Sequence, residues 1–367
     1  MKGPQAIVWP MDSAMVAGGA SPCCPKNFSH GAERHPESTA VGHAAVSAGL
    51  RRKDSAAMVL RMQVHDADRR LVLRAGLLAP ATLLGACGTP LPLTLPPGSS
   101  PAAAAAQARL MDSAQAHGLD AYRQLTDISV AFTGQWRPLI NRIQPEVVDR
   151  AYRGNSEERL LPALGTVAQS WRGSDDARLR KHVFWQRPDA TAARPGELGL
   201  WYDGRTNTDT ARATASALVA ECCGLFLLGP LWLVGRCMPI EVSGTERVDG
   251  RLCDAVQVWL RPGLGYSLQD RVTVLVDRDG HLTRRLRFTM EGFAGTQGAV
   301  AEVDWLDYSR RFGVLWPTRF YEEVVHPLRL PAHDWALSGL SVNRGFGLAD
   351  LRGPSLSGAA AAPAAPL

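Results

Sequence analysis

The segment that follows Cys87 lacks the short catalytic signatures of exported hydrolases. It contains no G-x-S-x-G, no S-x-x-K and no H-E-x-x-H. Its histidines are scattered without metal-ligand spacing, and Asp277 and Asp279 before Gly280 lack the later ligands of a calcium loop. We therefore predict a protein that is not an enzyme, with no catalytic residue, no metal site and no cofactor.

The sequence also lacks a block of basic residues. Its formal net charge is +5 over 367 residues, and the lysines and arginines are spread along the chain. A nucleic-acid-binding domain usually concentrates basic residues in a patch or stripe. We therefore predict no nucleic-acid partner.

One apolar run early in the chain has the features of an export signal. Arg69 and Arg70 precede it, it covers residues 75–86, and Cys87 follows it. A basic region, a short apolar core and a small-residue cleavage site are the three parts of such a signal. Since a permanent membrane span needs about 20 apolar residues, this run is too short to be one.

Two details of this signal resemble known sorting motifs. The residues around the arginine pair resemble a twin-arginine motif, which implies export of a folded protein. The end of the run resembles a lipobox, in which the cysteine receives a lipid, and consists of Leu84, Gly85, Ala86 and Cys87. Because Gly88 and not Asp follows the cysteine, the resemblance implies an outer-membrane lipoprotein facing the periplasm, anchored to membrane lipid through Cys87.

Composition divides the chain into five parts. Residues 1–57 show no apolar periodicity and are either disordered or a mis-annotated extension. Residues 58–86 form the signal peptide, and residues 87–106 form the lipidated cysteine and a Pro-, Ser- and Ala-rich tether. Residues 107–350 are long enough for one domain with a continuous core. Residues 351–367 form an Ala- and Pro-rich tail, which we expect to be disordered.

The central domain shows a period of two over most of its length. After a helix over residues 102–124, interrupted near Gly118, apolar residues alternate along segments typical of half-buried strands. Asp-Gly pairs at 203–204, 249–250 and 279–280 are typical of tight hairpin turns. We predict a mainly β protein with helices (α+β), in which about ten antiparallel strands form a large curved sheet or incomplete barrel.

Residues 208–238 interrupt this pattern, and residues 224–235 within them are the most apolar part of the mature chain. Residues 211–223 fit a helix, and the following run to Gly235 is punctuated by glycine and proline. We predict that this segment is a helical lid on the open side of the sheet. Cys237 and Cys253 are candidates for a disulfide that ties the lid to a strand, and Cys222 and Cys223 are either bridged elsewhere or buried as small apolar residues.

Several sequence cues together resemble a family of periplasmic carriers. They are an opening His117 to Tyr122 before the first strand, Leu227 to Leu231 after the 203–204 turn, the hairpin at 279–280, and Trp316-Pro317-Thr318 entering a late strand. In these features the chain resembles the lipoprotein carriers LolA and LolB. The resemblance implies an incomplete β-barrel, a helical lid and an apolar cavity for acyl chains.

We therefore predict an anchored envelope protein that binds a lipid, a lipoprotein acyl chain or another apolar ligand in the half-barrel. The alternative is a non-enzymatic structural or interaction module of the outer membrane with a filled core. The sequence predicts no oligomeric state. The residues that we expect to line the cavity, or else to be plain core, are Trp185, Phe226, Leu228, Leu231, Trp232, Leu233 and Phe288.

Overall fold

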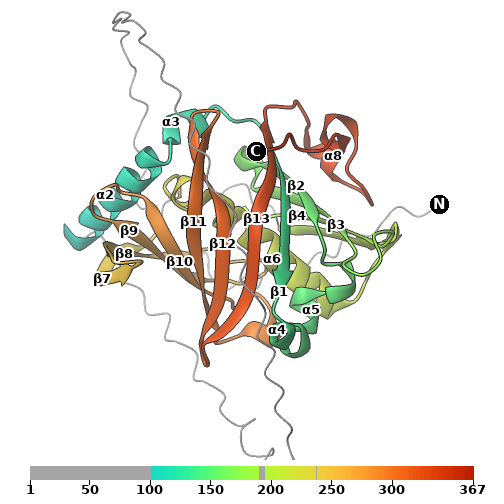
Figure 1. Cartoon of the computed structure of the whole chain (residues 1–367), viewed down its shortest axis with the longest axis horizontal. Helices are drawn as coiled ribbons and strands as arrows, with labels where there is room; N and C mark the ends of the chain where they lie inside the picture. The colour runs from blue at the N-terminus through green and yellow to red at the C-terminus, as the bar shows by residue number, and fades with distance from the viewer. Residues whose placement is uncertain (1–100, 190–194, 237) are drawn as a thin grey trace, which may run out of the picture. The chain divides into compact units, whose positions relative to one another are not determined.

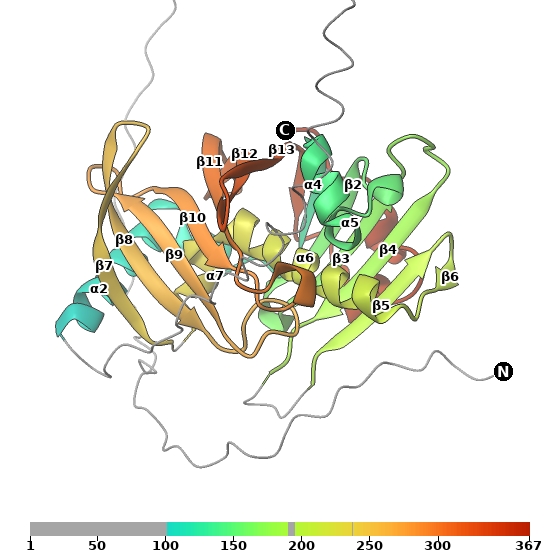
Figure 2. The same ribbon diagram turned by 90° about the horizontal axis from the view of Figure 1, so that it is seen from below.

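The computed structural model describes residues 101–189, 195–236 and 238–367. Within these residues the chain forms one antiparallel sheet of 13 strands that curves around a long helix (Figures 1 and 2). The export signal with Arg69, Arg70 and Cys87 lies outside the described residues, and so does Cys237. Predictions about the lipid anchor and the disulfide therefore stay predictions.

The strands follow one another around the sheet in the order β6-β5-β4-β3-β2-β1-β13-β12-β11-β10-β9-β8-β7. The first six are β1 (Ile128–Trp136), β2 (Ser156–Leu161), β3 (Thr166–Arg172), β4 (Arg180–Gln186), β5 (Glu197–Tyr202) and β6 (Arg205–Thr206). The others are β7 (Ile240–Val248), β8 (Arg251–Leu260), β9 (Asp270–Asp277), β10 (Thr283–Thr289), β11 (Val300–Arg311), β12 (Val314–His326) and β13 (Leu330–Val342).

The sheet is a meander with a single long-range pairing. The first and last strands lie side by side in the middle of the sheet, with Ile128 opposite Val342 and Trp136 opposite His333. The two ends of the meander, β6 and β7, are not paired with each other, so the barrel stays open. The prediction of a large unclosed antiparallel sheet is confirmed.

The number of strands differs from the ten that alternation predicts. The clearest omission is β2, which reads Ser-Glu-Glu-Arg-Leu-Leu and is almost entirely buried. Alternation of apolar and polar residues identifies a strand with one wet face, and β2 has none because its charged residues Glu158 and Arg159 are both covered. Strand β7 was missed because its middle residues are polar and exposed.

The chain crosses the open side of the barrel between β6 and β7 as the helices α6 (Thr210–Leu228) and α7 (Pro230–Leu233). The Asp209 side chain caps α6 by accepting a hydrogen bond from the Arg212 backbone N–H at 2.9 Å. The helix extends past Cys223, where we expected its end, and stops only at Gly229, which has a φ of 44° and precedes Pro230. An isolated glycine at position 224 is tolerated because the helix is held by packing.

Helix α6 fills the concave side of the sheet (Figure 2). Fourteen of its 19 residues are buried, so the predicted lid is largely a core element. Of the helices in the described ranges, α6 alone is long and apolar enough to cross a membrane, but 78% of its apolar window is buried inside the protein. That burial is typical of a core helix.

The other helices lie around this central unit. They are α2 (Pro101–Ala116), α3 (Leu119–Tyr122), α4 (Pro138–Ile143), α5 (Pro145–Val148) and α8 (Leu348–Leu351), with short 3-10 turns η1 (Arg150–Tyr152), η2 (Pro162–Leu164), η3 (Ala294–Thr296) and η4 (Gly358–Ala361). Helix α2 packs on β7, β8 and β9 and contacts α7. The predicted interruption near Gly118 is confirmed, since this residue separates α2 from α3 with a φ of 91°.

Two of the three predicted Asp-Gly turns have the expected backbone. Asp203-Gly204 and Asp249-Gly250 have positive φ at both residues and close the β5–β6 and β7–β8 hairpins. In the third turn, between β9 and β10, the residue with positive φ is His281 and not Gly280.

The Ala- and Pro-rich tail, which we expected to be disordered, runs beside β13 and β2. The Leu340 backbone N–H donates to the Ala365 carbonyl at 2.7 Å, and Gly339 forms a bridge with Pro366. The Arg159 guanidinium donates to the Ala362 carbonyl at 2.7 Å. These contacts satisfy polar groups of the two strands that would otherwise depend on water.

Candidate functional site

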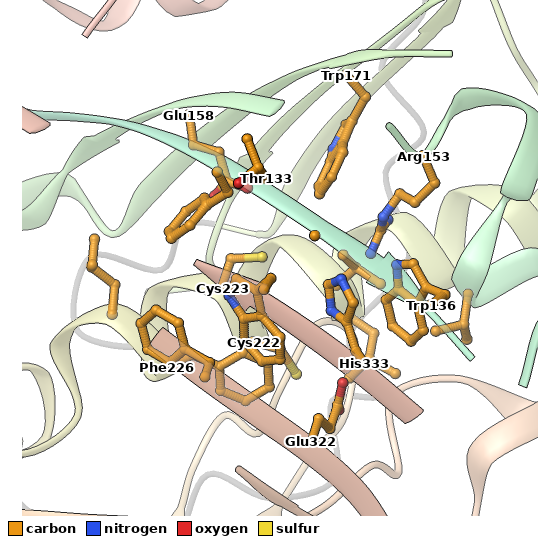
Figure 3. Close-up of a pocket in the computed structure, with 18 of the residues that line it drawn as sticks. Thr133, Trp136, Arg153, Glu158, Trp171, Cys222, Cys223, Phe226, Glu322 and His333 are labelled. Atoms are coloured by element: carbon orange, nitrogen blue, oxygen red, sulfur yellow. The ribbon is translucent and has the colours of Figure 1, made fainter. Parts of the chain in front are cut away.

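A cavity lies between α6 and the concave face of the sheet (Figure 3). It encloses about 780 Å³ of empty space including its open mouth, and the centre of a water molecule can occupy about 70 Å³ of it. One buried water needs about 10–15 Å³ of such space, so the enclosed part of the cavity has room for a few water molecules. The side chains that line it come from β1, β2, β3, β10, β12, β13, α5 and α6, so residues far apart in the sequence build one site.

One wall of the cavity is a continuous row of stacked rings. The ring of His333 stacks on Trp136 with centroids 4.1 Å apart and on Trp335 with centroids 4.4 Å apart. Trp335 stacks in turn on Phe320 at 5.0 Å, with an angle of 10° between the planes. The row crosses β1, β13 and β12. It gives the cavity a rigid apolar surface.

The apolar wall continues onto the helix. Phe226 of α6 lies 5.1 Å from Phe288 of β10 and 5.7 Å from Trp335, measured between ring centroids. Leu218 and Val219 of α6 complete this side. The helix thus supplies the floor of the cavity, and the sheet supplies the aromatic wall.

An arginine interrupts the apolar lining. Arg153 lies directly after η1, its side chain is 93% buried, and Figure 3 shows it pointing into the cavity. Its guanidinium carbon is 4.1 Å from the ring centroid of Trp171 and 5.3 Å from that of Trp136. A guanidinium is favourably held over such rings. The two tryptophans therefore fix the position of the charge.

Two glutamates face the same space. Burial raises the pKa of Glu158 and of Glu322 to about 7 in both cases, an effect that Arg153 only partly offsets. The Glu158 carboxylate also accepts a hydrogen bond from Ser156 Oγ at 3.3 Å. Each carboxyl group therefore keeps its proton up to about pH 7, whereas an exposed glutamate loses it near pH 4.5.

The remaining polar groups of the lining are uncharged at neutral pH. Burial lowers the pKa of His333 well below its usual value, so its ring is neutral. Burial also raises the pKa of the Cys222 and Cys223 thiols well above the ordinary range. Gln169 Nε2 lies 3.1 Å from the Cys223 sulfur and donates to it. At neutral pH, Arg153 is then the one fully charged group among the described residues of the lining.

The seven residues predicted to line a cavity fall into three places. Phe226 and Phe288 lie in the lining of the main cavity. Leu228 and Trp232 line a second, smaller hollow of about 310 Å³ beside Arg187 and Glu221. The other three are buried in the main core and line neither space: Trp185, Leu231 and Leu233.

Sequence reasoning missed the polar half of the site. Arg153, Glu158 and Glu322 match no motif, and His333 was set aside as a scattered histidine. They meet only because β1 pairs with both β2 and β13. One available signal was the concentration of charge in Ser156 to Arg159, directly before two leucines.

The predicted disulfide cannot be placed, because Cys237 lies outside the described residues. Its proposed partner Cys253 is fully buried in a small cluster with Val248, Ala255 and Leu275. Cys222 and Cys223, the other pair, lie at the cavity as thiols.

No family model and no curated protein sequence matches the chain. Solved structures do resemble it. A domain named as an outer membrane lipoprotein-sorting protein from Vibrio parahaemolyticus is 10% identical with a TM-score of 0.42, and the match covers 67% of this chain and 97% of that one. A LolA superfamily protein from Nitrosomonas europaea is 9% identical with a TM-score of 0.37, covering 67% and 97%.

A DUF1329 family protein from Desulfovibrio piger is 12% identical with a TM-score of 0.40, and the match covers 69% of this chain and 98% of that one. The chain is similar in fold to LolA-superfamily proteins. Likeness at this level concerns the path of the chain and not the ligand.

Proposed function

We propose that this chain binds the acyl chain of a lipid, or another apolar ligand of similar width, in the cavity between α6 and the sheet. The observation that carries the proposal is the lining of the cavity, an open hollow between helix and sheet with a row of stacked rings along one wall. A protein with a filled core would pack these rings against other side chains, because interiors are close-packed. An open hollow with such an apolar lining is suited to an apolar guest.

Binding is better supported than catalysis, although groups with shifted pKa values meet in the cavity. Such a meeting is one mark of an active site. Here, however, the shifts come first from burial, and burial holds the Cys223 thiol in its protonated form. The thiolate is the nucleophilic form of cysteine, and burial disfavours it at Cys223.

We further propose that the domain acts at a membrane to which it is attached. The support is the sequence pattern that ends at Cys87, followed by Gly88. A lipid anchor would hold the cavity near a source of acyl chains. Labelling with radioactive palmitate in a bacterial host tests this step. Label should enter the wild-type chain and not the Cys87→Ser variant, and equal labelling of the two would refute the anchor.

The binding proposal is tested by filling the cavity. Val219 lines the cavity from α6, and a Val219→Phe substitution places a larger side chain in the empty space. The matched control is Ala211→Phe, on an exposed position of the same helix outside the lining. Both variants of the full chain are titrated with a fluorescent acyl probe.

We expect Val219→Phe to weaken probe binding by about tenfold or more, the effect of losing about 1.4 kcal/mol of contact. Ala211→Phe should bind as the wild type does. Circular dichroism and thermal melting establish that both variants are folded. If the wild-type chain binds no acyl probe, or if both variants bind equally well, the cavity is not the binding site.

A further inference from the structure

We propose that the ligand has a negatively charged head and that the guanidinium of Arg153 binds this head inside the cavity. The inference rests on the proposed binding of an acyl ligand and specifies its class. The shared chemistry is a carboxylate or phosphate group attached to an acyl chain. It begins from a buried guanidinium that has no carboxylate partner among the described residues.

The protein pairs its other deeply buried basic side chains. Lys181, only 1% exposed, forms an ion pair with Asp149 at 2.8 Å. Arg159, fully buried, forms an ion pair with Glu157. Arg153 is the exception. Among the described residues, no carboxylate oxygen lies within 4.0 Å of its side-chain nitrogens.

The hydrogen bonds of Arg153 are also incomplete. Its Nε is buried without a hydrogen-bond partner. Its guanidinium has the rings of Trp136 and Trp171 as neighbours, which hold the charge but accept no ordinary hydrogen bond. Burying an unpaired charge is strongly unfavourable. A site that keeps such a charge at the wall of an open cavity is suited to an anion that enters the cavity.

The neighbouring acids Glu158 and Glu322 lie beyond ion-pair distance of this charge. Glu158 and Glu322 face the cavity, but burial favours their protonated, neutral forms. A protonated carboxyl group can donate a hydrogen bond to an incoming anion, which an ionised one cannot do. The two protonated glutamates therefore suit a ligand whose acidic head is ionised and bound to Arg153.

The shape of the cavity separates the two ends of such a ligand. Figure 3 shows Arg153 and Phe226 on opposite sides of the cavity. Between them run the stacked rings of His333 and Trp335. A carboxylate or phosphate at Arg153 would place the attached acyl chain along these rings toward Phe226. A guanidinium binds both head groups through two parallel hydrogen bonds.

The test compares ligands that share a sixteen-carbon chain and differ only in the head. The full wild-type chain is titrated with hexadecanoate, palmitoyl lysophosphatidate and, as the neutral reference, hexadecanol. The variants are Arg153→Gln, which removes the charge, and Arg153→Lys, which keeps it. The matched control is Arg150→Gln, three residues away on η1, where the side chain is 68% exposed and lies 3.7 Å from Asp175.

We expect the wild type to bind at least one of the two anions about tenfold or more tightly than hexadecanol, as charge-assisted hydrogen bonds of this kind allow. Arg153→Gln should lose this preference and keep its affinity for hexadecanol. Arg153→Lys should keep part of the preference, and Arg150→Gln should keep all of it. Whichever anion binds more tightly identifies the head as a fatty-acid carboxylate or a lipid phosphate.

Three results would overturn the inference, and they differ in what else they affect. Equal binding of anions and hexadecanol by the wild type would refute the charged head while leaving the acyl-binding function intact. Binding of none of the three would refute both. An unchanged preference in Arg153→Gln would show that the anion binds elsewhere, which also refutes the role of Arg153.

Discussion

The rings of Trp136 and His333 stack face to face, with centroids 4.1 Å apart and planes 9° apart. The two residues are direct cross-strand partners at the end of β1 and within β13, where the first and last strands of the sheet meet. The pairing that joins the first and last strands of the sheet therefore also builds one wall of the cavity. Disturbing it should affect both stability and ligand binding.

The first prediction concerns the ring of His333. Since burial keeps this ring neutral, a His333→Phe variant retains a flat uncharged ring between Trp136 and Trp335. Its free energy of unfolding should lie within about 1 kcal/mol of the wild-type value. His333→Ala removes two stacked contacts and should cost about 2 kcal/mol. Urea unfolding of both variants measures the difference, and equal losses would show that stacking contributes little.

The second prediction concerns Gly118, which has a φ of 91° between α2 and α3. A β-carbon added there would lie 2.4 Å from the Gly313 carbonyl oxygen. Gly118→Ala should therefore destabilise the domain by about 2 kcal/mol or more, from backbone strain and the clash together.

Gly204 is the matched control for this substitution. It has a φ of 78° but open space around an added β-carbon. Gly204→Ala should destabilise the domain by about 1 kcal/mol, from backbone strain alone. Thermal unfolding distinguishes the two, and a smaller loss at Gly118 than at Gly204 would contradict the close approach.

The third prediction concerns pH. Burial raises the pKa of Glu322 from 4.5 to about 7, so the folded protein holds this proton where the unfolded chain has lost it. The stabilisation is complete below about pH 4.5 and is lost as the pH rises toward 7. Glu322→Gln stays neutral, so its stability relative to the wild type should rise with pH between 5 and 7, by up to about 1.4 kcal/mol per unit.

The measurement is the difference in unfolding free energy between variant and wild type at each pH. The difference is needed because burial lowers the pKa of His117 and His182 to about 4, which makes the stability of both proteins rise with pH in part of the same range. A difference that does not vary with pH would show that Glu322 ionises normally.

The fourth prediction concerns the thiol of Cys223, which lines the cavity and is half-buried. Because burial raises its pKa, methyl methanethiosulfonate should modify it at least about tenfold more slowly than free cysteine at pH 7.5. Bound hexadecanoate should slow the reaction further. Mass spectrometry of peptides identifies the modified residue, with Cys223→Ser as the control. Modification at an unchanged rate with ligand present would place the ligand elsewhere.

The sequence predicted the parts of the fold that depend on local chemistry. The Asp203-Gly204 turn and the break at Gly118 follow from backbone preferences that neighbouring residues cannot override. The predicted end of α6 at residue 223 was wrong, because packing on the concave side of the sheet outweighs the low helix propensity of Gly224. Strand β2 was missed because its buried charges break the alternation on which the prediction relied.

The candidate site was predictable only in its apolar half. Phe226 and Phe288 belong to apolar segments, and any core of an open barrel would attract such residues. Arg153 and Glu322 lie 169 positions apart and come together through long-range strand pairing. No local pattern encodes such a meeting. The charged half of the site therefore required the structure.

The most direct test of the account is native mass spectrometry of the full chain purified from its own cells without added lipid. The account predicts that the wild-type chain carries a bound species with the mass of an acyl lipid that has a carboxylate or phosphate head. The Val219→Phe variant should lack this species. A wild-type chain that carries no lipid, and that takes none up from added hexadecanoate or palmitoyl lysophosphatidate, would contradict it.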